Sequence, residues 1–336
     1  MNKRRIKAVS TFSWVAIAAS AMTVQPIHAT DIPSLPQAIT SFGACVADGQ
    51  VYVYGGHTGE AHKYSVDTTT YEFLRIPLSG AEAWEKLPGP VRTQGASLIP
   101  WKGKLIRVSG LAAHNPTIDE DEHLVSLTDV AAFDPVTQAW EALPDLPAPR
   151  SSHDSVIVDG KLYVMGGWKL FGSRKGEWYD NAWVLDLNQT ESGWTEIPQP
   201  FKRRAIAVDA VGNHIVVIGG MDSNGDTSRE VDVFDIGTRT WSRGPKLPDG
   251  PMDGFGVAAC VINGTLYASP FAGTIIAWSP GETEWKEVAQ LAQKRFFHRI
   301  VPMSDTQILA IAGASRKEGH LNTVEVVEIN PLVTTK

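Results

Sequence analysis

The stretch Leu162-Tyr163-Val164-Met165-Gly166-Gly167 decides the fold, because versions of it recur along the chain. Close copies run from Val51 to Gly56 and from Ile215 to Gly220, and weaker copies end at Ser109-Gly110, Ser269-Pro270 and Ala312-Gly313. An apolar run that stops at two small residues is typical of a strand that ends in a tight turn. Six copies at this spacing predict a repeat architecture.

Each copy is followed by the same series of features. A variable polar loop leads to a third strand such as Asn181 to Asp186, and a turn then precedes a Trp-x-x-Leu-Pro element. This element is clearest at 84–88, 140–144 and, with Ile for Leu, 194–198, and it is looser after Trp241 and Trp285. Every period therefore predicts four short strands with no amphipathic helix. Because one such sheet cannot bury both of its faces, we expect the copies to stack around an axis as a six-bladed β-propeller.

The glycine pair, the spaced aromatic residue and the Trp before Leu-Pro together resemble the kelch repeat family over nearly the whole chain after residue 29. The resemblance implies an all-β fold with blades at approximately 40–88, 89–144, 145–198, 199–248, 249–291 and 292–331 plus 31–39. Two departures stand out, namely an expected insertion around residues 73–83 and the missing glycine pair of the fifth repeat.

The last repeat is too short to supply its own fourth strand, because the chain ends soon after Pro331. Residues 32–39 contain Leu35-Pro36 and read like the detached end of a repeat. We therefore expect the mature N-terminal segment to complete the last blade, which would close the ring and remove an exposed strand edge.

Residues 1–29 are predicted to be a signal peptide, because Lys3, Arg4, Arg5 and Lys7 precede an apolar stretch that ends shortly before Ala29. Serine and threonine interrupt this stretch, which favours a removable signal over a retained membrane helix. The mature chain, residues 30–336, is expected to be periplasmic or secreted, with no membrane span. Cys45 and Cys260 are expected to be free, since they occupy the same strand position in repeats that are not neighbours.

The composition restricts the class of partner. A formal net charge of -7 and a pI near 5.7 argue against general affinity for nucleic acid or anionic membrane. The chain has no phosphate-binding glycine loop, no nucleophile elbow and no paired-cysteine zinc pattern, so no cofactor and no metal are expected. A kelch-fold copper oxidase would need a tyrosine linked to cysteine and histidine ligands, and both cysteines fall in predicted inner strands instead.

Arginines gather where the chain enters the first strand of a blade, on the face that also carries the loops between the second and third strands. In related kelch proteins, arginines at this place contact acidic ligands, and the matching positions are Arg92, Arg150, Arg204 and Arg295. A guanidinium offers a planar fork of donors that suits a carboxylate. The alternative role is structural, with each arginine tying the backbone of one blade to the next.

Three further groups of residues could act at this face. His153 and His298 lie three residues beyond Arg150 and Arg295, where an imidazole could shuttle a proton or simply be a structural hydrogen-bonding residue. The loop from Trp168 to Asp180 is either a binding loop or a packing lid, and its candidates are Trp168, Trp178 and Tyr179 as ligand contacts and Glu177 as an acid or base. The acidic loop 119–122 could hold calcium or be solvated, and its spacing matches no ordered calcium loop.

Three functions compete on these observations. The first is an exported recognition module that binds an acidic glycan, a small organic acid or a protein at the channel mouth. The second is an enzyme similar to N-acetylneuraminate mutarotase, in which arginines hold the sugar carboxylate while an acid or base assists ring opening. The third is a structural component of the cell envelope.

Overall fold

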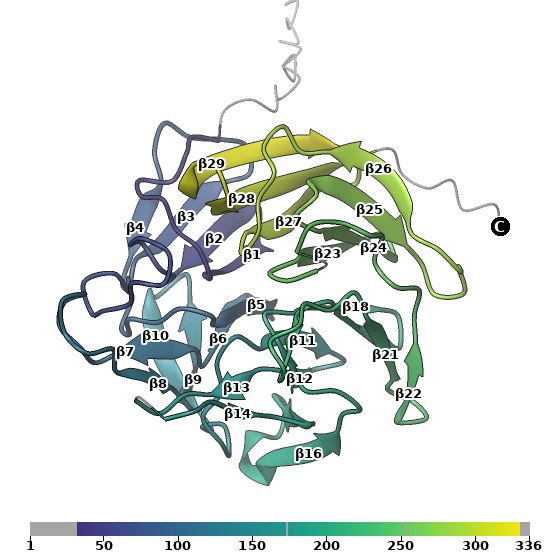
Figure 1. The fold of residues 1–336 in the computed structure, drawn as a ribbon, viewed down its shortest axis with the longest axis horizontal. Helices are drawn as coiled ribbons and strands as arrows, with labels where there is room; N and C mark the ends of the chain where they lie inside the picture. The colour runs from purple at the N-terminus through teal and green to yellow at the C-terminus, as the bar shows by residue number, and fades with distance from the viewer. Residues whose placement is uncertain (1–31, 173, 253, 330–336) are drawn as a thin grey trace, which may run out of the picture.

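The computed structural model describes residues 32–329 except positions 173 and 253, and within them the chain forms six small antiparallel sheets around a central channel (Figure 1). We call these sheets blades 1 to 6 in chain order. Blade 1 contains β1 (Gly43–Ala47), β2 (Gln50–Tyr54), β3 (Phe73–Pro77) and β4 (Glu85–Leu87). Blade 2 contains β5 (Ser97–Trp101), β6 (Lys104–Val108), β9 (Val130–Asp134) and β10 (Ala139–Leu143). Blade 3 contains β11 (Asp154–Val158), β12 (Lys161–Met165), β15 (Asn181–Asp186) and β16 (Trp194–Pro198). Blade 4 contains β18 (Ala207–Val211), β19 (His214–Ile218), β21 (Val231–Asp235) and β22 (Thr240–Arg243). Blade 5 contains β23 (Ala258–Ile262), β24 (Thr265–Ser269), β25 (Thr274–Trp278) and β26 (Lys286–Gln290). Blade 6 contains β27 (Arg299–Ser304), β28 (Gln307–Ser315) and β29 (Gly319–Glu328).

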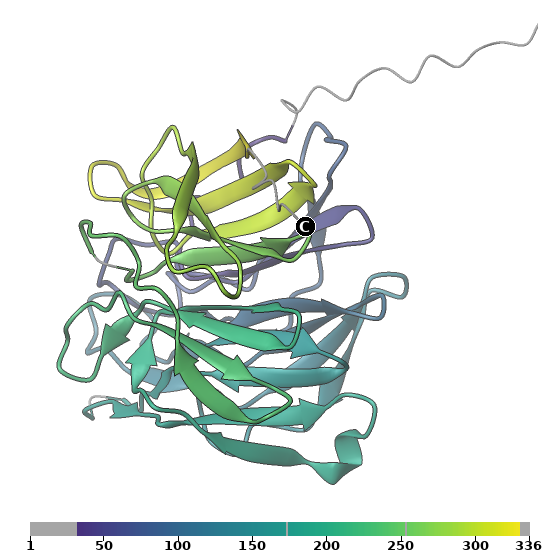
Figure 2. The same cartoon turned by 90° about the vertical axis from the view of Figure 1, so that its right-hand side faces the viewer.

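The first strands of the blades touch one another in a closed cycle, β1 to β5, β11, β18, β23, β27 and back to β1. Figures 1 and 2 show the blades set around this cycle, with the yellow strands of blade 6 beside the purple start of the described chain. The predicted six-bladed β-propeller is therefore confirmed. Helix is limited, in the described residues, to the 3-10 turn η1 (Thr190–Ser192), and nothing there has the length and apolar character of a membrane-spanning helix.

A ring of backbone hydrogen bonds surrounds the channel just before the inner strands. Each blade contributes one residue, whose N–H donates to the carbonyl of the next residue in the ring over 2.6 to 3.2 Å. The order of donors is Ser41, Phe297, Gly256, Ala205, Ser152, Gly95 and back to Ser41. All six residues have φ between 51° and 65°, a region that disfavours residues other than glycine. The four non-glycine members are held there because every blade contributes one donor and one acceptor to the same closed ring.

Two further hydrogen bonds recur between neighbouring blades and explain the sequence repeat. The second residue of the glycine pair donates its N–H across the junction in five cases: Gly56 to Thr93, Gly110 to Arg150, Gly167 to Arg203, Gly220 to Gly254 and Gly313 to Ile39. The tryptophan indole donates to a proline carbonyl of the preceding blade in four cases: Trp140 to Pro88, Trp194 to Pro144, Trp241 to Pro198 and Trp285 to Pro245. Blade 5 has Pro270-Phe271 in place of the pair, and the described part of the chain contains neither bond between blades 5 and 6.

Residues 32–39 complete blade 6, as the sequence predicts. The Leu35 N–H donates to Asn322 over 2.8 Å and the Ile39 N–H donates to Leu321 over 3.1 Å, so the segment lies along β29. The Trp84 indole donates to the Pro33 carbonyl over 2.9 Å, which repeats the tryptophan to proline bond of the other blades at the point of closure. The segment is not a regular strand, although it makes these bonds.

One expectation about blade 1 is wrong. Residues 73–83 are not an insertion, because Phe73–Pro77 is the third strand of the blade and pairs with β2 along its whole length. The extra residues of this blade lie earlier, in the long connection between β2 and β3. The error arose because Phe73 to Pro77 lacks the Asp or Asn that occurs in four of the other five third strands.

An ion pair crosses the channel below the backbone ring. Arg299 of β27 donates to Asp154 of β11 over 2.9 Å, and blades 6 and 3 stand opposite each other in the cycle. The Asp154 carboxylate also accepts from the Ser97 hydroxyl and the Val208 N–H of the two flanking blades, while Arg299 donates to the Phe42 carbonyl of blade 1. The ion pair therefore separates the upper end of the channel, where the long loops lie, from the lower end.

Candidate functional site

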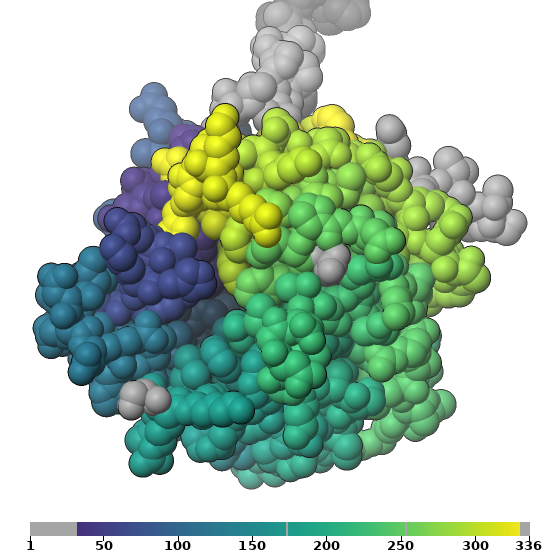
Figure 3. Space-filling view, in the orientation of Figure 1, coloured from purple at the N-terminus to yellow at the C-terminus, as the bar shows by residue number. Residues whose placement is uncertain are grey.

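A pocket of about 620 Å³ occupies the upper end of the channel, which we call the mouth pocket. Every blade contributes to its wall, through Tyr64, Glu122, Trp168, Arg204, Phe255 and His320 among others. Figure 3 shows this face hollowed near its middle, between the purple-blue surface of blade 1 and the green surface of blades 4 and 5. The volume suits a small-molecule ligand.

A triplet of residues before each inner strand builds the floor of the mouth pocket. The last residue of each triplet belongs to the backbone ring, and the residue before it faces the pocket in five blades: Thr40, Gln94, Arg204, Phe255 and Phe296. The first residue of the triplet points the other way and ties blades together. An arginine at the second position of the triplet therefore faces the pocket, whereas an arginine at the first position does not.

Arg204 is the arginine that the fold presents to the mouth pocket. Its guanidinium carbon lies 4.2 Å from the Trp168 ring centroid, 5.5 Å from that of Trp178 and 5.6 Å from that of Phe255. Its Nη2 donates to the Met221 sulfur over 3.3 Å, whereas its buried Nε has no partner in the described residues. Burial lowers the pKa of Arg204, because desolvation disfavours the charged form of the guanidinium.

The wall that holds Arg204 is assembled from two hairpin loops. One contains β13 (Trp168–Lys169) and β14 (Glu177–Trp178), which bring the two tryptophan rings to 5.3 Å from each other. The other contains β7 (Leu111–Ala113) and β8 (Leu124–Ser126), and its Ser126 N–H donates to the Leu170 carbonyl over 3.0 Å. The hairpin that contains β13 and β14 is therefore fixed to blade 2 by backbone hydrogen bonds, so the pocket wall is preorganised.

A group of titratable residues lies across the pocket from Trp168. The His57 ring centroid is 4.8 Å from that of Tyr64 and 5.0 Å from that of His320. Burial lowers the pKa of His57, and burial with the neighbouring His57 lowers the pKa of His320 to about 4, so both imidazoles are neutral at pH 7. Desolvation at the pocket wall raises the pKa of Glu122 and of Tyr64.

Arg150 and Arg295 do not line the mouth pocket, contrary to the expectation of a four-arginine mouth. Arg150 is fully buried and donates to the Gly166 and Asn181 carbonyls, while Arg295 donates to the Ala312 and Thr323 carbonyls and to the Glu325 carboxylate. Burial lowers the pKa of Arg150 to about 10. These contacts are the structural role that the sequence left as the alternative.

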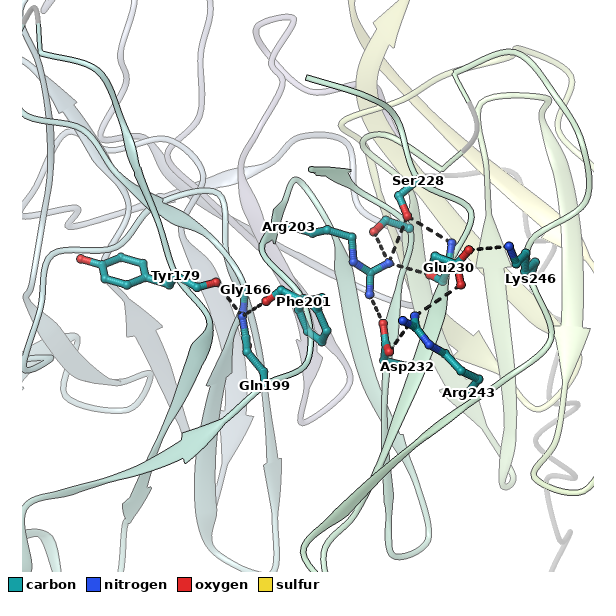
Figure 4. Close-up of polar contacts among 11 residues, drawn as sticks. Gly166, Tyr179, Gln199, Phe201, Arg203, Ser228, Glu230, Asp232, Arg243 and Lys246 are labelled. Carbon is teal, nitrogen blue, oxygen red and sulfur yellow. Dashed lines mark hydrogen bonds and ion pairs between the residues drawn. The ribbon is translucent and has the colours of Figure 1, made fainter. Parts of the chain in front are cut away.

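Arg203, rather than Arg204, is the equivalent of Arg150 in blade 4. It donates to the Gly219 and Glu230 carbonyls and pairs with Asp232, whose carboxylate also meets Arg243 (Figure 4). Both arginines stand four residues before their inner strand, and counting back from the predicted strand would have found this register. In blade 2 the residue four positions before the inner strand is Thr93, so Arg92 is not the equivalent of Arg150 either. Arg92 is exposed, donates to the Thr69 carbonyl over 2.9 Å and stacks on the Tyr71 ring.

The three candidate acid or base residues lie outside the mouth pocket. His153 and His298 are buried beneath the backbone ring, beside Gly167 and Gly313 respectively. Burial with nearby arginines lowers the pKa of His153 to about 3 and that of His298 well below its usual range. Glu177 is exposed and pairs with Lys169 over 3.2 Å. Both imidazoles are therefore neutral at pH 7, and they face the channel below the mouth pocket rather than the pocket itself.

The other predicted contacts divide between ligand wall and scaffold. Trp168 lines the pocket, and Trp178 packs against it with the two rings tilted by 54°. The Tyr179 hydroxyl donates to the Pro149 carbonyl over 2.8 Å, and the Tyr179 ring centroid lies 4.1 Å from the guanidinium carbon of Arg150. Tyr179 therefore packs within the scaffold. Around the acidic loop, as elsewhere in residues 32–329 apart from 173 and 253, no group of three possible metal ligands occurs. Cys45 and Cys260 are free and buried, as predicted.

Sequence reasoning missed the residues opposite Trp168. His57 and Tyr64 lie in the blade 1 loop and His320 lies in the blade 6 hairpin, neither of which stood out by length or by charge. The available signal was weak, because histidine follows the glycine pair directly only at His57. Glu122 was noticed only as one of four acidic neighbours.

Five four-stranded sheets and a sixth that residues 32–39 complete close into a ring with a pocket at one end of its channel, which defines a six-bladed β-propeller. The sequence profile described as the KLHDC2/KLHL20/DRC7 Kelch-repeats domain matches residues 7–203, and that of the Kelch motif matches residues 202–248. The chain therefore belongs to the kelch-repeat family, whose propellers commonly serve as protein-interaction modules.

Similar proteins agree with this assignment. Kelch-like protein terF of Aspergillus terreus is 26% identical over 70% of this chain and 50% of its own length, and Kelch-like protein 35 of Mus musculus is 24% identical over 75% and 39%. The chain thus spans about half or less of these relatives. The solved structure of YjhT superposes with a TM-score of 0.69, at 16% identity, over 89% of this chain and 99% of that one, which shows the shared fold.

Proposed function

We propose that this kelch propeller is a recognition module that binds an acidic ligand in the mouth pocket, with Arg204 as the anion contact. The observation that carries the proposal is the contrast between Arg204 and the other buried arginines. The Nη atoms of Arg150, Arg203 and Arg295 donate to backbone carbonyls, and those of Arg203 and Arg295 also meet carboxylates, whereas within the described residues Arg204 has aromatic neighbours and a single sulfur contact. A guanidinium so placed gains most from a carboxylate that arrives with a ligand.

The rest of the wall favours an oxygen-rich acid. Trp168, Gln94 and His320 each have a buried nitrogen without a partner in the described residues, and all three residues line the pocket with Arg204. The tryptophan and amide nitrogens are N–H donors, so they require acceptors. Phe255, Phe296 and Phe297 add apolar faces on which a sugar ring can stack. An acidic glycan or sugar acid meets these requirements best, and a small organic acid or an acidic protein segment meets fewer of them.

The proposal is tested by thermal shift and calorimetry with N-acetylneuraminate, glucuronate, citrate and neutral N-acetylmannosamine. A ligand that binds only the folded ring raises the melting temperature. Because a hydrogen bond to a charged group contributes about 1.5 to 3 kcal/mol, Arg204→Gln should weaken binding by roughly 10- to 100-fold. Arg92→Gln is the matched control, since Arg92 also stacks on an aromatic ring but lies outside the pocket. Equal loss in both variants, or binding of the neutral sugar alone, contradicts the proposal.

A second candidate is a mutarotase-like enzyme that acts on N-acetylneuraminate. The observation that favours it is that Glu122, Tyr64 and the two neutral imidazoles line the pocket that contains Arg204. Proton transfer at the ring oxygen and anomeric hydroxyl needs such groups. Nuclear magnetic resonance of anomer exchange would reveal this activity, and Glu122→Gln with Tyr64→Phe should slow it while Glu177→Gln should not.

Export completes the proposal. The basic and apolar pattern of residues 1–29 supports it, and these residues lie outside the described part of the chain. Expression of the full chain in a bacterium, followed by N-terminal sequencing of the periplasmic fraction, should give a mature chain that begins at Thr30. Retention of Met1 in a cytoplasmic product would contradict it. A purely structural envelope role remains as the third function if no acid binds.

A further inference from the structure

The lower end of the channel contains a second cavity, of about 410 Å³, on the far side of the Asp154–Arg299 ion pair. The third residue of every inner strand lines it. In five blades this residue is small or apolar, and in blade 4 it is an aspartate; the six are Cys45, Ile99, Val156, Asp209, Cys260 and Val301. A carboxylate thus replaces an apolar side chain at one point of an otherwise apolar layer.

Asp209 lacks the compensation that the other interior aspartates receive. Asp154 pairs with Arg299, and Asp232 pairs with Arg203 and Arg243. The Asp209 carboxylate accepts from the Ala210 N–H over 2.7 Å and from the Val261 N–H, and within the described residues it forms no ion pair. Because burial disfavours the charged form of this carboxylate, a proton or a cation from outside stabilises it.

The chemistry of the cavity limits the cation. A metal ion such as calcium needs six or more oxygen ligands, whereas the described residues contain no group of three possible metal ligands. The cavity offers one carboxylate without an ion pair and walls of valine, isoleucine, alanine and proline side chains. A protonated amine on a short alkyl chain matches both features, because its N–H donors meet the carboxylate while its methylene groups cover the apolar wall.

We propose that the lower cavity binds a small organic ammonium ion, with Asp209 as its counter-ion. The charged and titratable groups that face Asp209 are Asp154 on β11, Cys260 on β23 and Arg299 on β27. Asp154 neutralises Arg299, so Arg299 repels the ligand only weakly, and burial keeps the Cys260 thiol uncharged by raising its pKa, so Asp209 is the carboxylate left for the ligand. The site is independent of the mouth pocket, since the two cavities share no lining residue.

The test is calorimetry at pH 8 with n-butylammonium chloride, against sodium chloride at the same ionic strength and against neutral n-butanol. The wild type should bind butylammonium and neither control. Asp209→Asn, which preserves shape, and Asp209→Val, which restores the residue of blades 3 and 6, should each weaken binding at least tenfold. Asp159→Asn is the matched control, because Asp159 lies exposed in the turn after β11 and asparagine tolerates its φ of 49°.

Acid should weaken the same binding. Burial raises the pKa of Asp209 to about 7, so the ionised fraction, and with it the affinity for the amine, should fall by about 30-fold between pH 8 and pH 5.5. Arg204→Gln should retain butylammonium binding, which separates this site from the proposed function. Binding that survives both Asp209 variants, equal binding of butanol, or no binding by the wild type at pH 8 would each overturn the proposal.

Discussion

Removing the charge of Asp154 should destabilise the whole ring, because its carboxylate connects four blades. It accepts from Ser97 of blade 2, from Val208 of blade 4 and from Arg299 of blade 6, and it belongs to blade 3. Asp154→Asn leaves the Arg299 guanidinium without its anion in a partly buried channel. Breaking a buried ion pair in this way costs about 3 to 5 kcal/mol.

The measurement is urea or thermal unfolding followed by circular dichroism. At about 2 °C per kcal/mol for a domain of this size, the melting temperature should fall by roughly 6 to 10 °C. Arg299→Met alone should cost a similar amount, and the double variant should cost much less than the sum, because neither charge is then left unpaired. The control is Lys104→Met, which breaks the exposed pair with Glu141 and should change stability by less than about 1 kcal/mol.

A small effect of Asp154→Asn, below about 1 kcal/mol, would refute the reasoning, and so would full additivity of the two channel variants. Either result would mean that the ion pair is a solvated contact and that the backbone bonds and apolar packing between blades hold the ring together without it.

Further predictions follow from the contacts described above. Burial raises the pKa of Asp209 to about 7, so wild-type stability relative to Asp209→Asn should fall by about 1.4 kcal/mol per pH unit between pH 4 and pH 7, as measured by urea unfolding across that range; a flat difference would contradict it. The pKa of His153 falls to about 3, so the folded state keeps this imidazole neutral, and the stability advantage of the wild type over His153→Phe should shrink as the pH falls below about 6.5. Trp194→Phe removes the bond to the Pro144 carbonyl and should cost about 1 kcal/mol plus lost packing, read from thermal melts. Hydrogen exchange should be faster around Phe271 and Lys294, between blades 5 and 6, than around Gly167 and Lys202, between blades 3 and 4. Of these two junctions, only that of blades 3 and 4 has both the glycine-pair bond and the tryptophan-to-proline bond; uniform protection would argue against this.

The repeat pattern made the architecture predictable, since the relevant signals are local. Glycine pairs mark positions where the backbone adopts positive φ, as at Gly166 (63°) and Gly167 (85°), and Cβ atoms there would meet Ile206 and the Ser151 carbonyl closely. Tryptophan before Leu-Pro marks the bond to the preceding blade. The place of residues 32–39 was also predictable, because the last repeat lacked one strand and the chain had one spare segment.

The candidate site was only partly predictable. Arg204 and Trp168 line the mouth pocket, as expected, whereas Arg150, Arg295, His153 and His298 were also expected at the mouth and are buried away from it. A shift of one residue relative to the inner strand turns an arginine from the pocket into the junction between blades, and the arginine pattern alone does not reveal that shift.

The sequence by itself determined the number of blades, the strands that build them and the way the ring closes, because turns, periodicity and burial are encoded within each repeat. Tertiary structure alone decided which side chains meet at the axis. Asp154 and Arg299 are 145 residues apart, and Asp209 becomes unusual only when it is compared with its equivalents around the channel. Convergence of distant residues depends on the geometry of the closed ring, and no single repeat carries that information.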